Sequence, residues 1–189
     1  MRITGGIARG IPLIVPKGEI VRPATDSLRQ SVFSSLGAHI AGARFLDLFA
    51  GTGAYGLEAL SRGASGGVFV ERNHKAIDCI HRNLTAVCKS LKRDERSGIA
   101  VIPADATTAP AIGEPPDLVF VDPPYELIED AAPPLFARLT ELLAPRPGAI
   151  IVFEMPGGCE LAPSGWRTVK RLGKGIRQPT AVVFMRESR

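Results

Sequence analysis

The feature that most constrains the fold is a regular alternation of short apolar runs and amphipathic segments from residue 43 onward. Apolar runs rich in β-branched residues predict buried strands, and apolar residues spaced three or four apart predict helices. The predicted strands are 43–50, 66–71, 99–105, 117–122 and 148–154, and the predicted helices are 57–63, 74–91 and 127–143. Strands that alternate with helices at this spacing form a parallel sheet with helices on both faces.

The two ends of the chain extend this α/β core. Residues 2–16 hold two short extended pieces around Gly-rich turns, which predict a β-hairpin. A helix is expected to start after Thr25 or Asp26, both good N-cap residues, and to end at Gly37. The tail 166–186 predicts two more strands. We expect one domain, 1–189, divided into an N-terminal β-hairpin extension (1–20), an N-terminal helix (21–40) and the core (41–189).

Length and composition are those of a single globular domain. The chain has 189 residues, enough for a full core. It lacks a run of about 18 apolar residues and a signal peptide, so we expect a cytoplasmic protein without a membrane span. The cysteines (Cys79, Cys88 and Cys159) and the three histidines form no metal-ligand spacing, so no metal is predicted.

The net charge of +4 is unevenly distributed. Residues 1–44 carry six basic and two acidic side chains, residues 45–162 carry ten and sixteen, and residues 163–189 carry seven and one. Basic ends around an acidic middle favour a polyanion that docks on surfaces built from both termini, while a scattered solvated face is the alternative. The arginines expected to contact phosphates are Arg2, Arg9, Arg22 and Arg29.

A glycine loop follows the first predicted strand. Gly51 and Gly53 let the backbone approach a ligand where a Cβ would clash, and the next helix offers free N–H groups. Together with Gly56 the loop reads G-x-G-x-x-G. Glu71 ends the second strand, where its carboxylate suits a ribose diol. A glycine loop between a strand and a helix, followed by this acid, indicates a nucleoside ligand.

Two further acids favour S-adenosylmethionine over a nicotinamide cofactor. Asp47 lies four residues before Gly51, where a carboxylate can bind a cationic amino-acid end and would repel a pyrophosphate. S-adenosylmethionine carries an ammonium and a sulfonium. Asp105, near the end of the third strand, can accept a hydrogen bond from an adenine amino group, with a helix N-cap as its alternative role.

The sharpest pattern is Asp122-Pro123-Pro124-Tyr125 at the end of the fourth strand. Two prolines remove two backbone donors and leave carbonyls without ladder partners. Asp122 and the Pro123 carbonyl can accept hydrogen bonds from one amino group, and Tyr125 offers a flat face for a base. Two acceptors favour a pyramidal nitrogen with a localised lone pair, placed in line with a methyl donor. The pattern indicates methylation of an exocyclic amine on a flipped or unpaired base.

These residues do not choose the base or the nucleic acid, because adenine N6 and cytosine N4 suit Asp122 as well as guanine. The alternatives are a DNA adenine-N6 methyltransferase, a non-catalytic RNA-binding assembly factor and a nicotinamide oxidoreductase. The 189 residues leave no stretch for a DNA target-recognition domain, whereas an RNA loop presents a splayed base without one. No catalytic Tyr-x-x-x-Lys is evident, which argues against the oxidoreductase.

Four segments together resemble the bacterial 16S ribosomal RNA guanine-N2 methyltransferases, the RsmD family. They are RITGGIARGIPL (2–13), RPATDSLRQSVF (22–33), LDLFAGTGAYGLEALSRGA (46–64) and VFVDPPYE (119–126). The resemblance implies a Rossmann-like class I methyltransferase fold with a mostly parallel seven-stranded sheet. It implies S-adenosylmethionine as cofactor and, as substrate, a guanine of 16S rRNA in the small ribosomal subunit or its assembly intermediate. We expect the protein to be a monomer.

The candidate site follows from these motifs. The candidate catalytic residues are Asp122, Pro123, Pro124 and Tyr125, and the candidate cofactor residues are Asp47, Phe49, Ala50, Gly51, Thr52, Gly53, Glu71, Arg72, Asp105 and Ala106.

Overall fold

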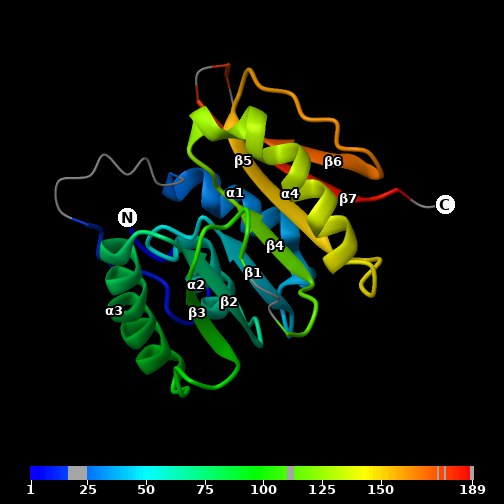
Figure 1. Ribbon diagram of the computed structural model, residues 1–189. Coiled ribbons are helices and arrows are strands. Elements are labelled where there is room, and N and C mark those ends of the chain that lie inside the picture. The colour runs from blue at the N-terminus through cyan, green and yellow to red at the C-terminus, as the bar shows by residue number, and fades with distance from the viewer. Residues whose placement is uncertain (17–24, 110–112, 174, 177, 188–189) are drawn as a thin grey trace.

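The computed structural model of the protein describes residues 1–16, 25–109, 113–173, 175–176 and 178–187, and Figure 1 labels its elements. In chain order these are α1 (Asp26–Leu36), η1 (Gly37–His39), β1 (Arg44–Leu48), α2 (Ala54–Ser61), β2 (Gly66–Glu71), α3 (His74–Leu91), β3 (Ile99–Pro103), β4 (Leu118–Val121), η2 (Tyr125–Leu127), α4 (Ile128–Leu142), β5 (Ile150–Pro156), β6 (Trp166–Leu172) and β7 (Pro179–Arg186). All the strands and helices predicted from 26 onward are present.

The seven strands form one sheet in the order β3-β2-β1-β4-β5-β7-β6. Strands β1 to β5 pair in parallel, and β7 pairs antiparallel with both β5 and β6. The predicted mostly parallel, seven-stranded sheet is therefore confirmed. The strand order reverses between β1 and β4, which leaves a crevice at the carboxyl ends of these strands where ligands bind in open α/β sheets.

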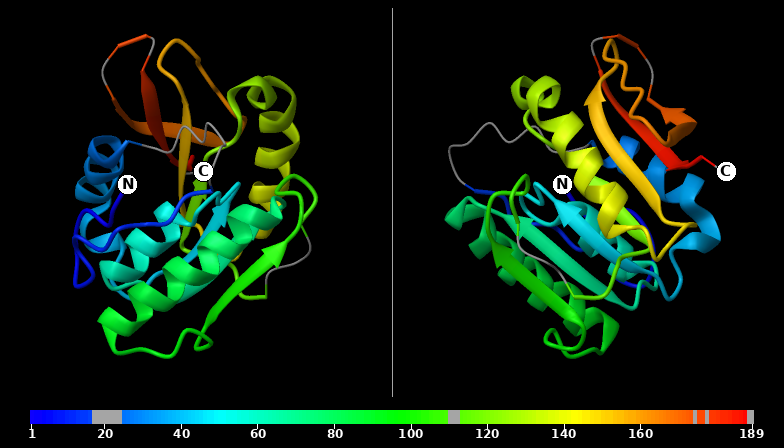
Figure 2. Two further views of the ribbon diagram at one scale, coloured as in Figure 1. Left: turned by 90° about the vertical axis from the view of Figure 1, so that its left-hand side faces the viewer. Right: turned by 45° about the vertical axis from the view of Figure 1, so that its right-hand side comes forward.

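Helices cover both faces of the sheet, as Figure 2 shows from two sides. One hydrophobic cluster joins α1, α2 and α3 to the face that includes Phe45, Phe69 and Phe120. A second cluster joins α4 to the opposite face through the stacked rings of Phe136 and Phe153, whose centroids lie 5.8 Å apart. Because central parallel strands are buried on both faces, they read as continuous apolar runs.

Two helix ends follow the chemistry expected from the sequence. The Thr25 side chain accepts a hydrogen bond from the Leu28 N–H, and α1 ends at Gly37, whose φ is 52°. The predicted N-cap and end of this helix are confirmed. In α3 the Asn73 side chain accepts hydrogen bonds from the Lys75 and Ala76 N–H groups, which caps the helix that follows β2.

The N-terminal segment folds back on itself but forms no regular hairpin. Arg2 and Pro12 make a single antiparallel bridge, supported by a hydrogen bond from the Ile3 N–H to the Ile11 carbonyl at 2.9 Å. Two further hydrogen bonds, from the Gly10 N–H to the Ile3 carbonyl (2.9 Å) and from the Leu13 N–H to the Met1 carbonyl (3.1 Å), join the same two pieces, so the predicted hairpin is present as a short, irregular pairing. Its turn packs on α2, where the Ile7 N–H donates to the Ser61 carbonyl at 2.8 Å. The segment is thus an irregular covering of α2.

Helix α2 begins at Ala54, three residues before the predicted start at 57. Gly53 takes the N-cap position in a left-handed conformation, with φ 80°. A Cβ on Gly56 would lie 2.3 Å from the ring of Phe69 and 2.6 Å from that of Phe45. The loop glycines that look like interruptions in the sequence therefore allow the helix to start early and pack closely on β1 and β2.

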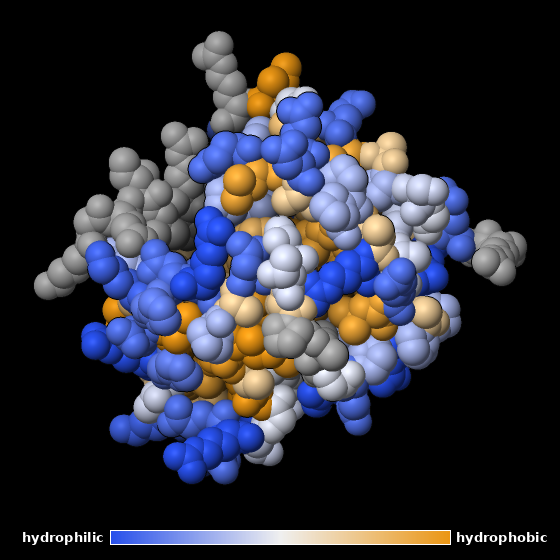
Figure 3. Space-filling model, in the orientation of Figure 1, coloured by the Kyte–Doolittle hydropathy of each residue, from blue (hydrophilic) through white to orange (hydrophobic). Residues whose placement is uncertain are grey.

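The face of the molecule seen in Figure 3 is largely hydrophilic, interrupted by separate hydrophobic areas. Within the described part of the chain, none of the helices is long and apolar enough to cross a membrane. The same residues contain no group of three or more His, Cys, Asp or Glu side chains that could hold a metal ion.

Candidate active site

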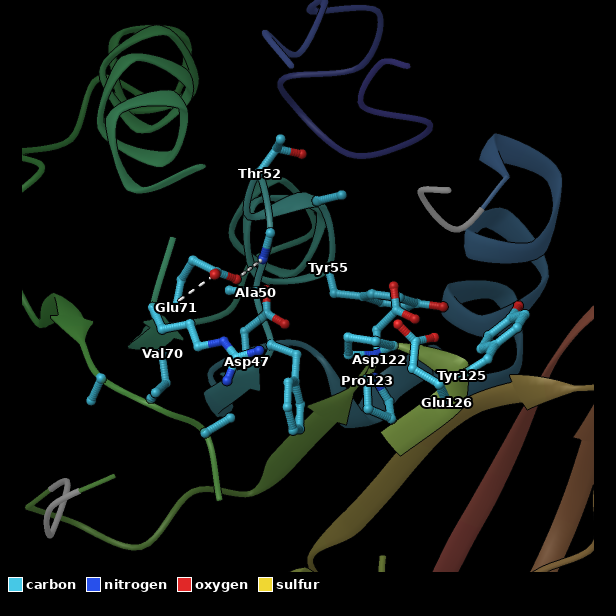
Figure 4. A pocket seen from close by; sticks show the side chains of 17 residues that line it. Asp47, Ala50, Thr52, Tyr55, Val70, Glu71, Asp122, Pro123, Tyr125 and Glu126 are labelled. Atoms are coloured by element: carbon cyan, nitrogen blue, oxygen red, sulfur yellow. Dashed lines mark hydrogen bonds between the residues drawn. The ribbon is translucent and has the colours of Figure 1, made fainter. Parts of the chain in front are cut away.

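A pocket with a volume of about 530 Å³ lies at the carboxyl ends of β1, β2 and β4. Its size is that of a small-molecule site. Figure 4 shows the side chains that line it: Asp47, Phe49, Ala50, Gly51, Thr52, Ala54, Tyr55, Val70, Glu71, Arg72, Ala104, Ala106, Asp122, Pro123, Pro124, Tyr125 and Glu126. Residues far apart in the chain thus share one cavity at the point where the strand order reverses.

Most of the predicted site residues line this one pocket. The four predicted catalytic residues do so, together with eight of the ten predicted cofactor residues. Gly53 and Asp105 are not among the lining residues. The structure therefore brings the glycine loop and the Asp122–Tyr125 corner together, while the role of each side chain stays a prediction.

The loop after β1 is tightly constrained. Phe49 has a φ of 57°, a left-handed conformation that strains a non-glycine residue by about 1–3 kcal/mol and is typical of functional sites. Gly51 (φ 54°) donates its N–H to Glu71 Oε2 at 2.8 Å. At Gly53 a Cβ would lie 3.2 Å from the Phe69 ring. Backbone conformation and packing on β2 therefore account for a glycine at position 53, and its predicted close approach to a ligand stays a prediction.

Glu71 connects β2 to this loop. Besides the bond from Gly51, its Oε1 accepts hydrogen bonds from the Arg72 N–H (2.9 Å) and the Asn73 N–H (2.8 Å). The dashed lines in Figure 4 mark bonds at this carboxylate. Three backbone donors fix its position at the pocket wall, where an acceptor for a sugar diol was predicted.

Asp47 lines the pocket and is only 2% exposed. Its Oδ2 accepts a hydrogen bond from the Gly56 N–H at 2.9 Å. Burial raises the pKa of Asp47 to about 8, against the opposing effect of this bond and with a smaller contribution from the Glu71 charge. A cation in the pocket would favour the ionised form of this carboxyl.

Asp105 is engaged by protein groups. Its Oδ1 accepts hydrogen bonds from the Thr107 N–H and hydroxyl, and its Oδ2 lies 2.9 Å from Nη1 of Arg72. The Thr107 bonds, followed by the Arg72 guanidinium, lower the pKa of Asp105 although burial opposes them. Asp105 thus orients Arg72, which lines the pocket, and its predicted contact with adenine stays a prediction.

The corner after β4 places a carboxyl at the other side of the pocket. The Asp122 N–H donates to the Leu48 carbonyl at 3.4 Å, which joins the corner to β1. The Pro124 carbonyl accepts the Leu127 N–H at 2.9 Å, which starts the turn η2. Burial raises the pKa of Asp122 well above its usual range, and the neighbouring Glu154 and Asp47 raise it further. Figure 4 shows Asp122, Tyr125 and Glu126 gathered at this side.

The family of the chain follows from comparison with known proteins. A family model described as "Conserved hypothetical protein 95" matches residues 1–182. The ribosomal RNA small subunit methyltransferase D of Haemophilus influenzae is 32% identical over 178 residues, which cover 93% of this chain and 90% of that protein. The chain belongs to this methyltransferase D family.

Two further matches agree with membership of the methyltransferase D family. The ribosomal RNA small subunit methyltransferase D of Escherichia coli is 38% identical over 125 residues, which cover 66% of this chain and 60% of that protein. The solved structure of the methyltransferase yhhF from Escherichia coli is 29% identical, with a TM-score of 0.75, and the match covers 100% of this chain and 99% of that one.

Arg29 has a structural role in this member of the methyltransferase D family. The prediction that it contacts a phosphate is therefore wrong. Its side chain is fully buried. It donates to Glu58 Oε2 at 3.3 Å and Asp26 Oδ1 at 2.8 Å, and also to the Arg2 carbonyl. A buried guanidinium requires such partners, and here they join α1, α2 and the N-terminal segment. The sequence pattern could not show that Glu58 faces Arg29 from another helix.

The other predicted phosphate contacts stay predictions. Arg2 and Arg9 are exposed, and Arg2 lies 3.9 Å from Asp26 Oδ2. Arg22 lies outside the described residues.

Two residues at the site were missed by the sequence reading. Tyr55, in the first turn of α2, lines the pocket, and its hydroxyl donates to Glu154 Oε2 at 2.8 Å. Glu154 is 2% exposed and lies near the carboxyl end of β5. A signal was available, because Glu154 closes a predicted strand as Glu71 does, but an isolated acid there is more often a solvated end.

Asn83 is a third missed residue. It is 1% exposed, on α3. Its Oδ1 accepts the Ile14 N–H at 2.7 Å, and its Nδ2 donates to the carbonyls of Ile14 (3.0 Å) and Thr52 (3.1 Å). Asn83 therefore ties the N-terminal segment to the glycine loop at the pocket.

Proposed function

We propose that the protein transfers a methyl group from S-adenosylmethionine to the exocyclic N2 of a guanine in 16S rRNA of the small ribosomal subunit. The observation that carries this proposal is the meeting of two motifs in one pocket. The glycine loop of residues 49–53 and the Asp122–Tyr125 corner contribute lining residues from opposite sides. The first suits a nucleoside cofactor and the second an amino group on a base.

The polar lining of the pocket fits the proposed cofactor. Four carboxyl groups and one guanidinium line it or lie at its floor: Asp47, Glu71, Asp122, Glu126 and Arg72. An acidic lining favours a ligand with an ammonium and a sulfonium and disfavours a pyrophosphate. Asp47 and the glycine loop would hold the amino-acid end, and Glu71 the ribose. When bound, S-adenosylmethionine supplies an electrophilic methyl group.

The chain's own residues would orient the amino group. Asp122 and the Pro123 carbonyl accept its hydrogen bonds, and Tyr125 stacks on the base. Because most of the rate enhancement comes from position and electrostatics, the rigid Pro-Pro turn matters as much as the carboxylate. Asp122 then accepts the proton that the methylated amino group loses.

The choice of rRNA rests on the family, since relatives of this chain are named ribosomal RNA small subunit methyltransferases D. The E. coli relative is matched over 60% of its length, and the activity of the whole protein is therefore part of the proposal. We propose further that the protein acts as a monomer in the cytoplasm, where small subunits assemble.

A basic sheet edge supports an RNA substrate. In the sheet register Val121 pairs with Phe153, Phe153 with Val182, and Val182 with Arg171. Arg171 thus lies three strands from β4, about 15 Å away at a strand spacing of about 4.8 Å. Arg167 and Lys170 are exposed on the same strand, β6. These three residues form the β6 basic edge, whose charge can attract the phosphates of an RNA that reaches the pocket. Arg171 also donates to the Gly157 and Cys159 carbonyls, and Arg167 lies level with Leu118 at the start of β4.

The proposal is tested by methyl transfer from labelled S-adenosylmethionine to small subunits that lack the modification, followed by nucleoside analysis. Label in N2-methylguanosine is the expected result. Label on duplex DNA as N6-methyladenine, with none on subunits, would assign the DNA activity instead. Binding to subunits without transfer to any substrate would favour a non-catalytic assembly factor.

A further inference from the structure

Glu154 and Asp122 lie side by side at the ends of neighbouring strands. The parallel pairing of β4 and β5 ends with Val121 opposite Phe153, so the next position in the register places Asp122 beside Glu154. Side chains at paired positions of a sheet point to the same face. The two carboxyl groups therefore face the same side of the sheet, with Asp122 at the pocket and Glu154 behind it.

Tyr55 fixes the position of the Glu154 carboxyl. Its hydroxyl donates to Glu154 Oε2 at 2.8 Å. The Tyr55 ring stacks on Phe120, with centroids 5.1 Å apart and an interplanar angle of 18°, and also contacts Phe33. Both Tyr55 and Glu154 are buried. A residue of α2 that lines the pocket thus holds an acid that does not line it.

The ionisable groups around this pair come from several elements. The charge of Arg29, on α1, acts on Glu154, and that of Asp47, on β1, acts on Asp122. Tyr55 of α2 contacts Glu154 directly, while the β7 residue paired with Glu154 is the uncharged Ala181. Burial raises the pKa of Glu154 to about 7, opposed by the Tyr55 hydrogen bond and the Arg29 charge. Near neutral pH, Tyr55 and Arg29 therefore favour a negative charge on Glu154, which disfavours a second one on Asp122.

We propose that Glu154, held by the Tyr55 hydroxyl, is a positioning residue that controls whether Asp122 carries its charge. This inference rests on the proposed function and adds two residues to it. Asp122 must be ionised to accept both the hydrogen bond and the proton of the amino group. An ionised Glu154 opposes that state, and an approaching amino group that donates to Asp122 restores it. Asp122 is therefore ionised, and able to accept a proton, mainly when a substrate amino group is bound.

The test is the pH dependence of the single-turnover methylation rate in the Glu154→Gln variant. Glutamine keeps the shape of the side chain and accepts the Tyr55 hydrogen bond, but carries no charge. Without the neighbouring charge Asp122 ionises more readily, so the acidic limb of the profile should move to lower pH by about 1–3 units. A role in folding alone would lower the rate at every pH and leave the limb in place.

Tyr55→Phe provides a second variant that keeps the ring stack and removes only the hydroxyl. Loss of its hydrogen bond disfavours the Glu154 anion, so the limb should again move to lower pH, by less than in Glu154→Gln. An unmoved limb in both variants overturns the proposal, whatever their absolute rates. If the wild-type protein itself transfers no methyl group to subunits, the proposed function fails instead, so the two failures are distinguishable.

Discussion

At the scale of single residues, the site depends on carboxyl groups that burial keeps from ionising freely. Asp122 is the one that meets the amino group in the proposed reaction. We predict that Asp122→Ala abolishes methyl transfer, with a loss of at least about 10²–10⁴-fold, while S-adenosylmethionine still binds. Rate assays together with calorimetric titration of the cofactor check this. Retained activity, or loss of cofactor binding, would contradict the assignment.

Asp47 makes stability depend on pH. Its pKa is about 8 in the folded protein, above the ordinary value of 3.8, so the folded state binds the proton more tightly. Its contribution to stability is full below about pH 4 and is lost as pH rises through 8. Asparagine does not ionise, so the Asp47→Asn variant does not lose this stability. We predict that the melting temperature of the variant minus that of the wild type is larger at pH 8 than at pH 5. The same difference in melting temperature at both pH values would exclude the effect.

At the scale of elements, α3 joins the N-terminal segment to the glycine loop through one side chain. Because Asn83 is buried, Asn83→Ala leaves the Ile14 and Thr52 backbone groups without their partner, at a cost of about 1–3 kcal/mol. We predict lower stability and weaker S-adenosylmethionine binding. Arg82→Ala, an exposed neighbour on the same helix, is the matched control for chemical denaturation and cofactor titration. Unchanged cofactor affinity in Asn83→Ala would show that the glycine loop does not depend on the hydrogen bonds of Asn83.

At the scale of the whole molecule, the β6 basic edge adds positive charge to the edge strand of the sheet. Arg167 and Lys170 of this edge are exposed to solvent. We predict that Arg167→Glu combined with Lys170→Glu raises the KM for small subunits and makes it less sensitive to salt. The cofactor affinity should not change, because neither residue lines the pocket. A KM equal to the wild-type value at low salt would place the RNA elsewhere.

The sequence by itself determined the class of fold and the chemistry of the pocket. Apolar periodicity depends on residues close in the chain, and it predicted the strands and helices from 26 onward with ends within a few residues. The two motifs were readable because each is continuous. Residues 47–53 span the end of β1 and residues 122–125 follow β4, and the carboxyl ends of parallel strands meet at one edge.

Only the tertiary structure decided which polar side chains have partners inside the protein. Arg29 reads as a surface arginine until Glu58 is placed opposite it. In the sequence Glu154 looks like an ordinary strand end, but the sheet register places it beside Asp122. Asn83 looks like a helix surface residue, but in the fold it forms hydrogen bonds with Ile14 and Thr52. These contacts join residues 29 to 69 positions apart, and no local pattern records them. Burial depends on such contacts, and burial sets the charge of each group at the site.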